Sequence, residues 1–347
     1  MIELSNGLGI NNLTGENVRR ILVVAPINLA STQIAYEIPF RVLESPSFFW
    51  KLIPEHLMKI NLVEGNDTLI LHRCYQGSTL AAARFARLTG VKVIYEIDDD
   101  LLDVREETWG KRFQTGHLSQ IIKMFLDEAD LIKAGSPELE RRLTEKSYQV
   151  VYMPYAVNKY NLMRKRSNSI CRVGYFGTPH HKEDIEAIFP ALETIKNIFQ
   201  EKVQFEFIGC YPREWQQLDA RIFPYQPDYN GFMEFMRQRS WDIGLAPLRK
   251  TFFNEAKSDS KFRDYSATGA VGIYSDLAPY RDSVVNGENG WLVDPTTEAW
   301  VDTIQLAITS DQREQMFRRA QTLLENKNSP EVIARQWVAL LKNLSPI

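Results

Sequence analysis

The feature that most constrains the fold is a regular alternation of short apolar runs with longer helical segments. In the first half, RRILVVAP, DTLILHR and VKVIYEI read as strands, and GSTLAAARFARLTG between two of them reads as a helix that ends at Gly90. A helix at about 116–129, the strand DLIKAGS, a helix at 137–146 and the strand QVVYMP continue this order. Apolar strands joined by helices predict a parallel sheet, because parallel neighbours need a crossover connection.

The alternation is interrupted once and then restarts, which indicates two domains. The segment NKYNLMRKRSNS at 158–169 is polar and basic, as a linker would be. After it come CRVGYFG, a helix over about 183–200, VQFEFIGC, a helix near 231–240, WDIGLAPL, a helix from about 258 and AVGIYSD. We expect doubly wound α/β domains at 1–165 and 166–329, and a segment 330–347 whose helix crosses back to the first domain.

Charge and cysteine usage exclude several classes of protein. The formal net charge of -3 gives no overall attraction to nucleic acid, so we expect no nucleic-acid partner. The three cysteines are widely spaced, which indicates neither a disulfide framework nor a zinc site. No apolar run approaches the ~20 residues of a membrane helix, and the first residues lack the features of a signal peptide. We therefore expect a cytoplasmic protein.

The segment FFWKLIPEHLMKI at 48–60 mixes aromatic residues with two lysines. We expect a helix that packs against the first sheet. The alternative is peripheral contact with the inner face of a membrane that carries a lipid-linked acceptor.

A cationic cluster is predicted where the helix from about 258 begins. Lys257 and Lys261 are one turn apart, and Ser258 adds a hydroxyl. A helix start with free N–H groups and two ammonium groups suits a diphosphate, and Asp264 could accept hydrogen bonds from ribose hydroxyls. The structural alternative is a solvated helix face with pairs of opposite charge.

Several segments together resemble a known family. DIGLAPL, KSDSKFRDYSATGAVGIYSD and PYRDSVVNGENGWLVD look like the donor-binding half of retaining, nucleotide-sugar-dependent GT-B glycosyltransferases. ADLIKAGSPELERRL, VVYMPYAVN and VGYFGTPHHKEDIEAI are similar to further segments of that family, in the same order. IYEIDDDLL is similar to a subgroup found in bacterial surface-polysaccharide clusters.

The resemblance implies a GT-B fold, with two Rossmann-like domains that face an interdomain cleft. It implies retaining transfer of a sugar from a nucleoside diphosphate sugar to a hydroxyl of a glycan, lipid-linked or protein-linked acceptor. The reaction would need no metal and no cofactor, with Lys257 and Lys261 stabilising the departing diphosphate. A catalytically weak nucleotide-sugar-binding or scaffold protein is the alternative. A dinucleotide oxidoreductase is disfavoured, because no G-x-G-x-x-G turn follows a predicted strand.

The loop after the first strand of the second half resembles the phosphate loop of the family but departs from it. Gly177 and Thr178 begin this loop, and Lys182 stands where the family has the lysine of an Arg-then-Lys pair. His180 and His181 stand beside it, and we consider His181 a donor contact or an ordinary loop histidine.

The rest of the donor site shows one more departure from the family pattern and two candidate contacts to the nucleobase. The family has two glutamates separated by seven residues; Asp264 takes the second position and Ala256 the first, with Glu255 next to it. Tyr211 and Tyr229 follow strands near the expected nucleobase, and either could stack on it or pack in the core.

Three consecutive aspartates follow the strand VKVIYEI, and three roles compete for them. An Asp-x-Asp pair holds a divalent cation in GT-A enzymes, and an aspartate can also cap the next turn. The third role lies on the acceptor side, since Asp98 matches a family position that often carries a histidine. Asp98, then Asp99, and Lys261 are therefore our candidate catalytic residues. Arg73 ends the strand DTLILHR and could face the cleft, but we favour a position on the surface.

Overall fold

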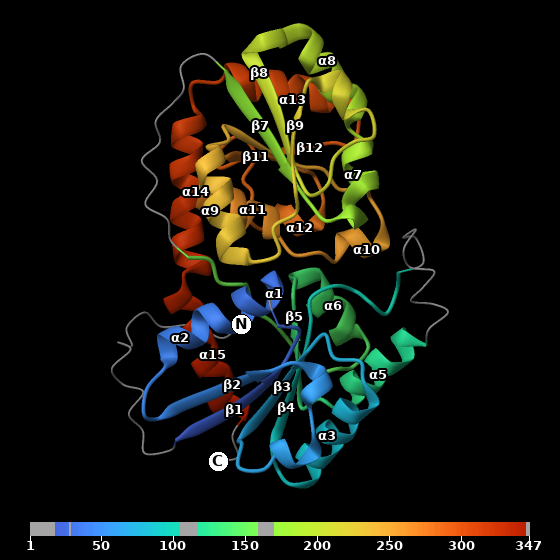
Figure 1. The fold of residues 1–347 in the computed structure, drawn as a ribbon, viewed down its shortest axis with the longest axis vertical. Coiled ribbons are helices and arrows are strands. Elements are labelled where there is room, and N and C mark those ends of the chain that lie inside the picture. The colour runs from blue at the N-terminus through green and yellow to red at the C-terminus, as the bar shows by residue number, and fades with distance from the viewer. Residues whose placement is uncertain (1–17, 28, 105–116, 159–169, 345–347) are drawn as a thin grey trace.

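The computed structural model describes residues 18–27, 29–104, 117–158 and 170–344, which form two lobes with one parallel sheet each (Figure 1). The predicted linker 158–169 lies outside the described residues except for Asn158. The predicted α/β class with parallel sheets is confirmed: every pairing within the two sheets is parallel.

The first sheet has the strand order β2-β1-β3-β4-β5-β6. Its strands are β1 (Arg19–Val24), β2 (Phe48–Ile53), β3 (Thr68–His72), β4 (Lys92–Ile97), β5 (Leu131–Ala134) and β6 (Val150–Tyr152). Between them lie α1 (Ala30–Thr32), the π-helical turn η2 (Gln33–Glu37), α2 (Ile38–Leu43), 3-10 turns η3 (Glu55–Leu57) and η4 (Ile60–Leu62), α3 (Gly77–Leu88), α5 (Leu118–Glu128) and α6 (Pro137–Glu145). Central strands β3 and β4 are buried almost throughout, which explains their continuous apolar runs.

The second sheet has the strand order β12-β11-β10-β7-β8-β9. Its strands are β7 (Cys171–Phe176), β8 (Val203–Ile208), β9 (Arg221–Phe223), β10 (Ile243–Ala246), β11 (Val271–Ser275) and β12 (Trp291–Val293). The connecting helices are η5 (Pro179–His181), α7 (Lys182–Glu186), α8 (Phe189–Phe199), η6 (Gln200–Lys202), η7 (Trp215–Leu218), α9 (Tyr229–Arg239), α10 (Phe252–Glu255), α11 (Ser260–Thr268), α12 (Ala278–Arg281), α13 (Thr297–Thr309) and α14 (Arg313–Asn328).

The prediction of a helix at 48–60 is wrong, because Phe48–Ile53 forms the edge strand β2 beside β1. Aromatic and branched residues favour an extended chain, and Pro54 ends the strand. The strand has only one neighbour and is half exposed, so it lacks the continuous apolar run of a central strand. The peptide continues as the turns η3 and η4.

The last helix, α15 (Pro330–Leu344), packs against α2 of the first lobe (Figure 1). Its Trp337 is fully buried between Tyr36 and Phe40, and the Trp337 indole nitrogen donates to the Ala35 carbonyl at 3.1 Å. The chain therefore passes from the second lobe, where α14 lies beside α11, back to the first. Among the described residues, no helix combines the length and the apolar composition that crossing a membrane requires.

The two lobes touch on both sides of the space between them. On one side, Gln33 donates to the Asp228 carboxylate at 2.9 Å and accepts from the Tyr229 amide at 2.8 Å. On the other side, Ser136 donates to the Ala256 carbonyl at 2.6 Å. Arg142 of α6 donates to the Phe252 carbonyl of α10 at 2.8 Å and lies 3.6 Å from the centre of the Phe252 ring. These contacts fix the distance between the sheets.

Replacing Arg142 with methionine should lower the thermal unfolding midpoint by about 5 °C or more. The Arg142 guanidinium is buried, and its loss leaves the buried Asp100 carboxylate, 3.0 Å away, without its cation. The matched control is Arg141→Met, because Arg141 is exposed and its partners are Glu145 and Glu138, of which Glu138 stays paired with Arg142 in this variant. Equal midpoints for the two variants, measured by circular dichroism, would show that Arg142 does not hold the lobes.

Candidate functional site

A cavity of about 290 Å³ lies between the carboxyl ends of the two sheets. Both lobes contribute to its wall, as expected for ligand sites of doubly wound sheets. The predicted site residues that line it are Asp98, Asp99, Gly177, Thr178, His181, Tyr229, Lys257, Ser258, Lys261 and Asp264. Two predicted donor contacts are not among the lining residues: Lys182 is exposed on α7, and Tyr211 packs edge-on against Trp215.

The start of α11 forms the donor-side wall, but its position corrects the sequence-based prediction. The helix begins at Ser260, so Lys257 and Ser258 lie in the loop before it and not on its face. Asp259 occupies the capping position, yet its carboxylate is held by Lys327 at 3.1 Å and by the Ser283 hydroxyl at 2.5 Å. Within the described residues, no side chain caps this first turn, so its N–H groups can bind an anion.

Lys261 is a buried cation at the cavity. Lys261 is only 5% exposed, and its ammonium lies 5.3 Å from the ring centre of Tyr175 and 5.1 Å from that of Phe176. Burial, with the nearby Lys257 charge, lowers the pKa of Lys261 to about 8. Neither lysine forms an ion pair with a carboxylate in the described part of the chain. The site therefore has positive charge to offer an anionic ligand.

His181 lies near the same two lysines, and its imidazole ring is neutral. Burial, followed by the charges of Lys257 and Lys261, lowers the pKa of His181 to about 3. Its Nδ1 lies 2.9 Å from the Asp184 carboxylate, which also accepts from the Arg249 amide at 2.9 Å. The ring is thus oriented by Asp184 rather than solvated.

Gly177 is a glycine for a steric reason. A Cβ atom there would lie 2.9 Å from the Tyr175 hydroxyl and 3.3 Å from the His181 Cβ, so a larger residue would displace the loop. The carbonyl of Ile208 accepts from the Gly177 amide at 3.1 Å, which keeps the loop against the second sheet. Thr178 follows at the start of η5.

Asp264 and Tyr229 form a buried group on the wall. The Tyr229 hydroxyl donates to Asp264 Oδ1 at 2.7 Å, and Arg263 Nε donates to the same oxygen at 2.9 Å. Tyr229 is 2% exposed and belongs to the core that joins the lobes. Tyr225 is a better placed aromatic residue for a nucleobase, because it lines the cavity and is 47% exposed. Its loop position carried no sequence signal.

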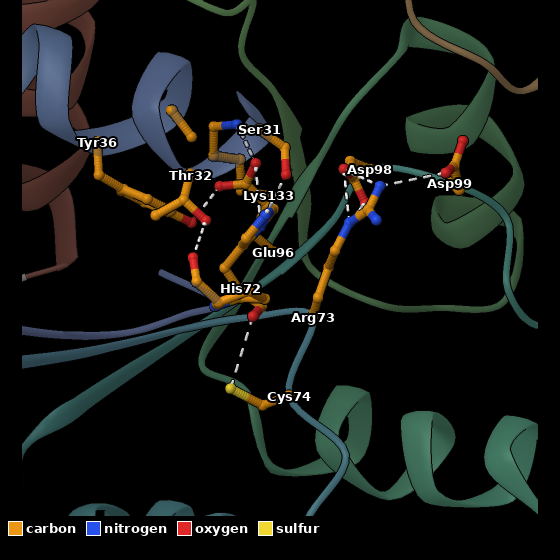
Figure 2. Close-up of polar contacts among 12 residues, drawn as sticks. Ser31, Thr32, Tyr36, His72, Arg73, Cys74, Glu96, Asp98, Asp99 and Lys133 are labelled. Carbon is orange, nitrogen blue, oxygen red and sulfur yellow. Dashed lines mark hydrogen bonds and ion pairs between the residues drawn. The ribbon is translucent and has the colours of Figure 1, made fainter. Parts of the chain in front are cut away.

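The first lobe presents a paired carboxylate to the cavity. Asp98 accepts two nearly parallel hydrogen bonds from Arg73, at 2.8 Å from Nε and 2.6 Å from Nη2 (Figure 2). Burial alone would raise the pKa of Asp98, but the Arg73 charge lowers it to about 2, so the carboxylate is ionised. Asp98 in turn raises the pKa of Arg73. Arg73, whose backbone is left-handed with φ of 52°, lines the cavity, which was the alternative to the favoured surface position. Its side chain is 36% exposed.

The other two aspartates also pair with arginines. Asp99 lies 3.3 Å from Arg73 and lines the cavity, whereas Asp100 lies 3.0 Å from Arg142 outside it. In the described residues, no three histidine, cysteine, aspartate or glutamate side chains form a metal-binding group. All three carboxylates are thus engaged by guanidinium groups.

Comparison with known proteins places this geometry among glycosyltransferase folds. By sequence, no family model and no curated protein matches the chain. HepE from Anabaena in complex with UDP has a similar structure, with a TM-score of 0.69, 11% identity, and coverage of 94% of this chain and 100% of that chain. Sucrose-phosphate synthase from Thermosynechococcus elongatus matches with a TM-score of 0.66, 14% identity and coverage of 94% and 99%.

A UDP-forming trehalose-phosphate synthase from Burkholderia xenovorans is similar as well, with a TM-score of 0.65, 12% identity and coverage of 95% and 100%. These structural neighbours are GT-B glycosyltransferases, and this chain has their fold. Identities this low show the fold alone.

Proposed function

We propose that this protein transfers a sugar from a nucleoside diphosphate sugar to an acceptor hydroxyl, with retention at the anomeric carbon and without a metal. One observation carries the proposal: the buried Lys261 lies at the start of α11, across a cavity from the ionised Asp98. Among the described residues, Lys261 has no carboxylate in an ion pair and the helix start has no side-chain cap. The structures of HepE with UDP and with UDP-glucose support a donor of this class.

The donor side supplies positive charge where a leaving diphosphate gains negative charge. Lys257 and Lys261 face the cavity together with the first N–H groups of α11. Preorganised cations lower the barrier because they bind the transition state more strongly than the ground state. Two lysines and a helix start supply the charge that a divalent cation would otherwise bring, which is our reason for proposing a metal-independent reaction.

The first lobe supplies negative charge beside the sugar. Asp98 is ionised and rigidly held by Arg73, so it can stabilise the positive charge that develops on the sugar ring, and Asp99 adds a second carboxylate. We place the acceptor on this side. We propose that the acceptor is a glycan of a surface polysaccharide and that the transfer takes place in the cytoplasm. Phe49, Leu57 and Ile60 are exposed around β2 and could touch a membrane that carries a lipid-linked acceptor.

A nucleotide-sugar-binding protein without turnover is the second candidate, and one observation favours it. Ala256 is fully buried at the position where the resemblance predicts a glutamate, and its carbonyl is held by Ser136. The neighbouring Glu255 lies 3.4 Å from the Ala278 amide. A site of this kind would bind the donor but would release no UDP.

Titration calorimetry with UDP, GDP and ADP, followed by UDP release from UDP-glucose and UDP-N-acetylglucosamine, tests the proposal. We expect UDP to bind and at least one UDP-sugar to turn over slowly with water or a simple sugar as acceptor, equally with and without EDTA. Binding without turnover would establish the second candidate. Activity that disappears with EDTA would refute the metal-independent reaction, and no nucleotide binding would refute both candidates.

UDP affinity should fall as the pH rises above 8. The free protein holds the pKa of Lys261 at about 8, and a bound diphosphate raises it, so binding requires the protonated ammonium. Affinity should be nearly constant from pH 7 to 7.5 and decrease by up to about tenfold for each unit above pH 8. Calorimetry of Lys261→Met should give a flat profile. The same slope in that variant would assign the titration to another group.

A further inference from the structure

A row of buried polar residues lies behind the acceptor wall of the cavity. His72, Glu96 and Lys133 stand side by side on β3, β4 and β5, since His72 pairs with Glu96 and Glu96 with Lys133 in the sheet register. All three are fully buried. Charged and titratable side chains in the middle of a sheet are unfavourable unless a partner or a function requires them.

Ser31 connects this row to the cavity. Ser31 lines the cavity, and its hydroxyl oxygen lies 3.0 Å from His72 Nε2 (Figure 2). The other ring nitrogen, His72 Nδ1, lies 3.6 Å from Glu96 Oε1. A hydroxyl, an imidazole and a carboxylate thus follow one another from the cavity into the sheet, which is the order of a hydroxyl, a base and the group that orients the base.

Glu96 is held in place from two further sides. Lys133 Nζ lies 3.0 Å from Glu96 Oε1, and the Tyr36 hydroxyl donates to Glu96 Oε2. Lys133 also lies 4.2 Å from the ring centre of Tyr155, a cavity residue. The carboxylate therefore cannot turn away from His72 without breaking both contacts.

The surroundings of His72 keep its ring neutral. Burial lowers the pKa of His72, while Glu96 and Asp98 oppose the change and Arg73 and Lys133 add to it. Two further titratable groups contact His72: the Tyr36 ring lies edge-on to its imidazole, and the Cys74 thiol donates to its backbone carbonyl. Within the described residues Nδ1 makes no hydrogen bond, and Glu96 Oε1 lies 3.6 Å from it. A ring proton on Nδ1 would be attracted by this carboxylate and would leave Nε2 to accept a hydrogen bond from Ser31.

We propose that Ser31 and His72 relay the acceptor proton out of the reaction centre, an inference that rests on the glycosyl transfer proposed above. The acceptor hydroxyl gives its proton to Ser31 Oγ as Ser31 gives its own proton to His72 Nε2. The acceptor oxygen forms its bond to the anomeric carbon while the bond from that carbon to the diphosphate oxygen breaks. His72 becomes an imidazolium that Glu96 stabilises, and it returns the proton through Ser31 to the leaving phosphate or to water.

Asp98 is less suited to this task although it lies nearby. Its carboxylate is ionised down to about pH 2 and accepts two hydrogen bonds from Arg73, so its affinity for a proton is low. The arrangement separates three roles: Asp98 supplies fixed charge, Ser31 touches the acceptor, and His72 is a positioning residue that acts through Ser31.

The tautomer of His72 tests the relay without any substrate. Long-range proton–nitrogen NMR of the full chain should show Nδ1 protonated and Nε2 unprotonated, with the signals assigned by their loss in His72→Gln. If that variant fails to fold, Ser31→Ala assigns them instead, because loss of the hydrogen bond should shift the Nε2 signal of one histidine. A proton on Nε2, or no shift in Ser31→Ala, would overturn the relay.

Kinetics with UDP-glucose, or whichever UDP-sugar the wild type turns over, test the consequence. Ser31→Ala and His72→Gln should lower kcat by roughly 10²-fold and leave UDP affinity within about twofold. Wild-type kcat should fall as the pH drops through the His72 pKa, which lies below 6.5, and this acid limb should be missing in His72→Gln.

The matched control is His56→Gln, because His56 is an exposed residue of η3 away from the cavity. It should keep the wild-type kcat and the acid limb. An unchanged kcat in Ser31→Ala would overturn the relay, and so would an equal loss of UDP affinity, which would indicate a structural role. If the wild-type protein bound no nucleotide, the proposed function would be refuted. The NMR measurement of the His72 tautomer needs no nucleotide and would still test the relay.

Discussion

Replacing Lys261 with methionine is expected to lower kcat/KM for the sugar donor by roughly 10²- to 10³-fold, with most of the loss in kcat. The ammonium is buried at the cavity wall, where the low dielectric strengthens its attraction for a developing phosphate charge. UDP affinity should fall as well, since UDP carries the same diphosphate. The measurement is UDP release at saturating and limiting donor, together with calorimetry of UDP binding.

The same substitution should not destabilise the free protein, and this distinguishes a functional cation from a structural one. Methionine removes the ammonium that lies over the Tyr175 and Phe176 rings but keeps an unbranched apolar chain to fill the same space. Burial lowers the pKa of Lys261, which means that the folded state disfavours the charged form at neutral pH. Removing this cost should leave the thermal midpoint equal or higher, unlike most substitutions of a buried residue.

The matched control for Lys261 is Lys202→Met, which removes an exposed lysine from η6 at the outer end of the second lobe. This variant should retain wild-type turnover and UDP affinity. If Lys261→Met bound UDP as tightly as the wild type, the diphosphate would lie elsewhere. A lower midpoint with normal activity would identify Lys261 as a packing residue only.

The sheets were predictable because their central strands are buried on both faces. β3, β4, β7, β8, β10 and β11 appear in the sequence as apolar runs between helices, and their order alone indicates a parallel sheet. Edge strands carry a weaker pattern. β2 was mistaken for a helix, and the edge strands β9 and β12 were missed, whereas β6, which is equally short, was predicted from the apolar residues of QVVYMP. The segment from α1 to α2 contains the π-helical turn η2 between the two helices, and the cap positions of α1 and η2 make no side-chain hydrogen bond.

The candidate site was predictable only where its residues are close in sequence. Lys257, Ser258, Lys261 and Asp264 fall within eight positions, so one local pattern pointed to all of them. Arg73 was expected on the surface because most arginine side chains are exposed, and its partner Asp98 is 25 positions away in the sequence. Ser31, His72 and Glu96 come together from three separate elements: the register of β3 and β4 places His72 beside Glu96, and α1 brings Ser31 to His72. Such contacts have no signal in a single sequence.

Replacing Asp98 with asparagine should lower kcat by roughly 10²-fold, because the fixed negative charge beside the sugar is lost while the shape is kept. Asp98 also neutralises Arg73, so the change removes a buried pair, and a loss of activity could follow from a displaced Arg73 alone. A double-mutant cycle with Arg73→Met separates the two effects. Asp127→Asn, on the exposed side of α5, controls for the loss of one carboxylate.

If Asp98 acts on the substrate, Arg73→Met should retain more activity than Asp98→Asn, and the double variant should resemble Asp98→Asn. If the pair is only structural, both single variants should lose activity and stability equally, and the double variant should lose no more than either.

The pH dependence gives an independent check. The folded pKa of Asp98 is lowered to about 2, so its stabilising contribution is complete above about pH 4 and is lost as the pH falls toward 2. The wild type should therefore lose unfolding free energy over that interval more steeply than Asp98→Asn, whereas its kcat between pH 5 and 8 should show no titration of Asp98.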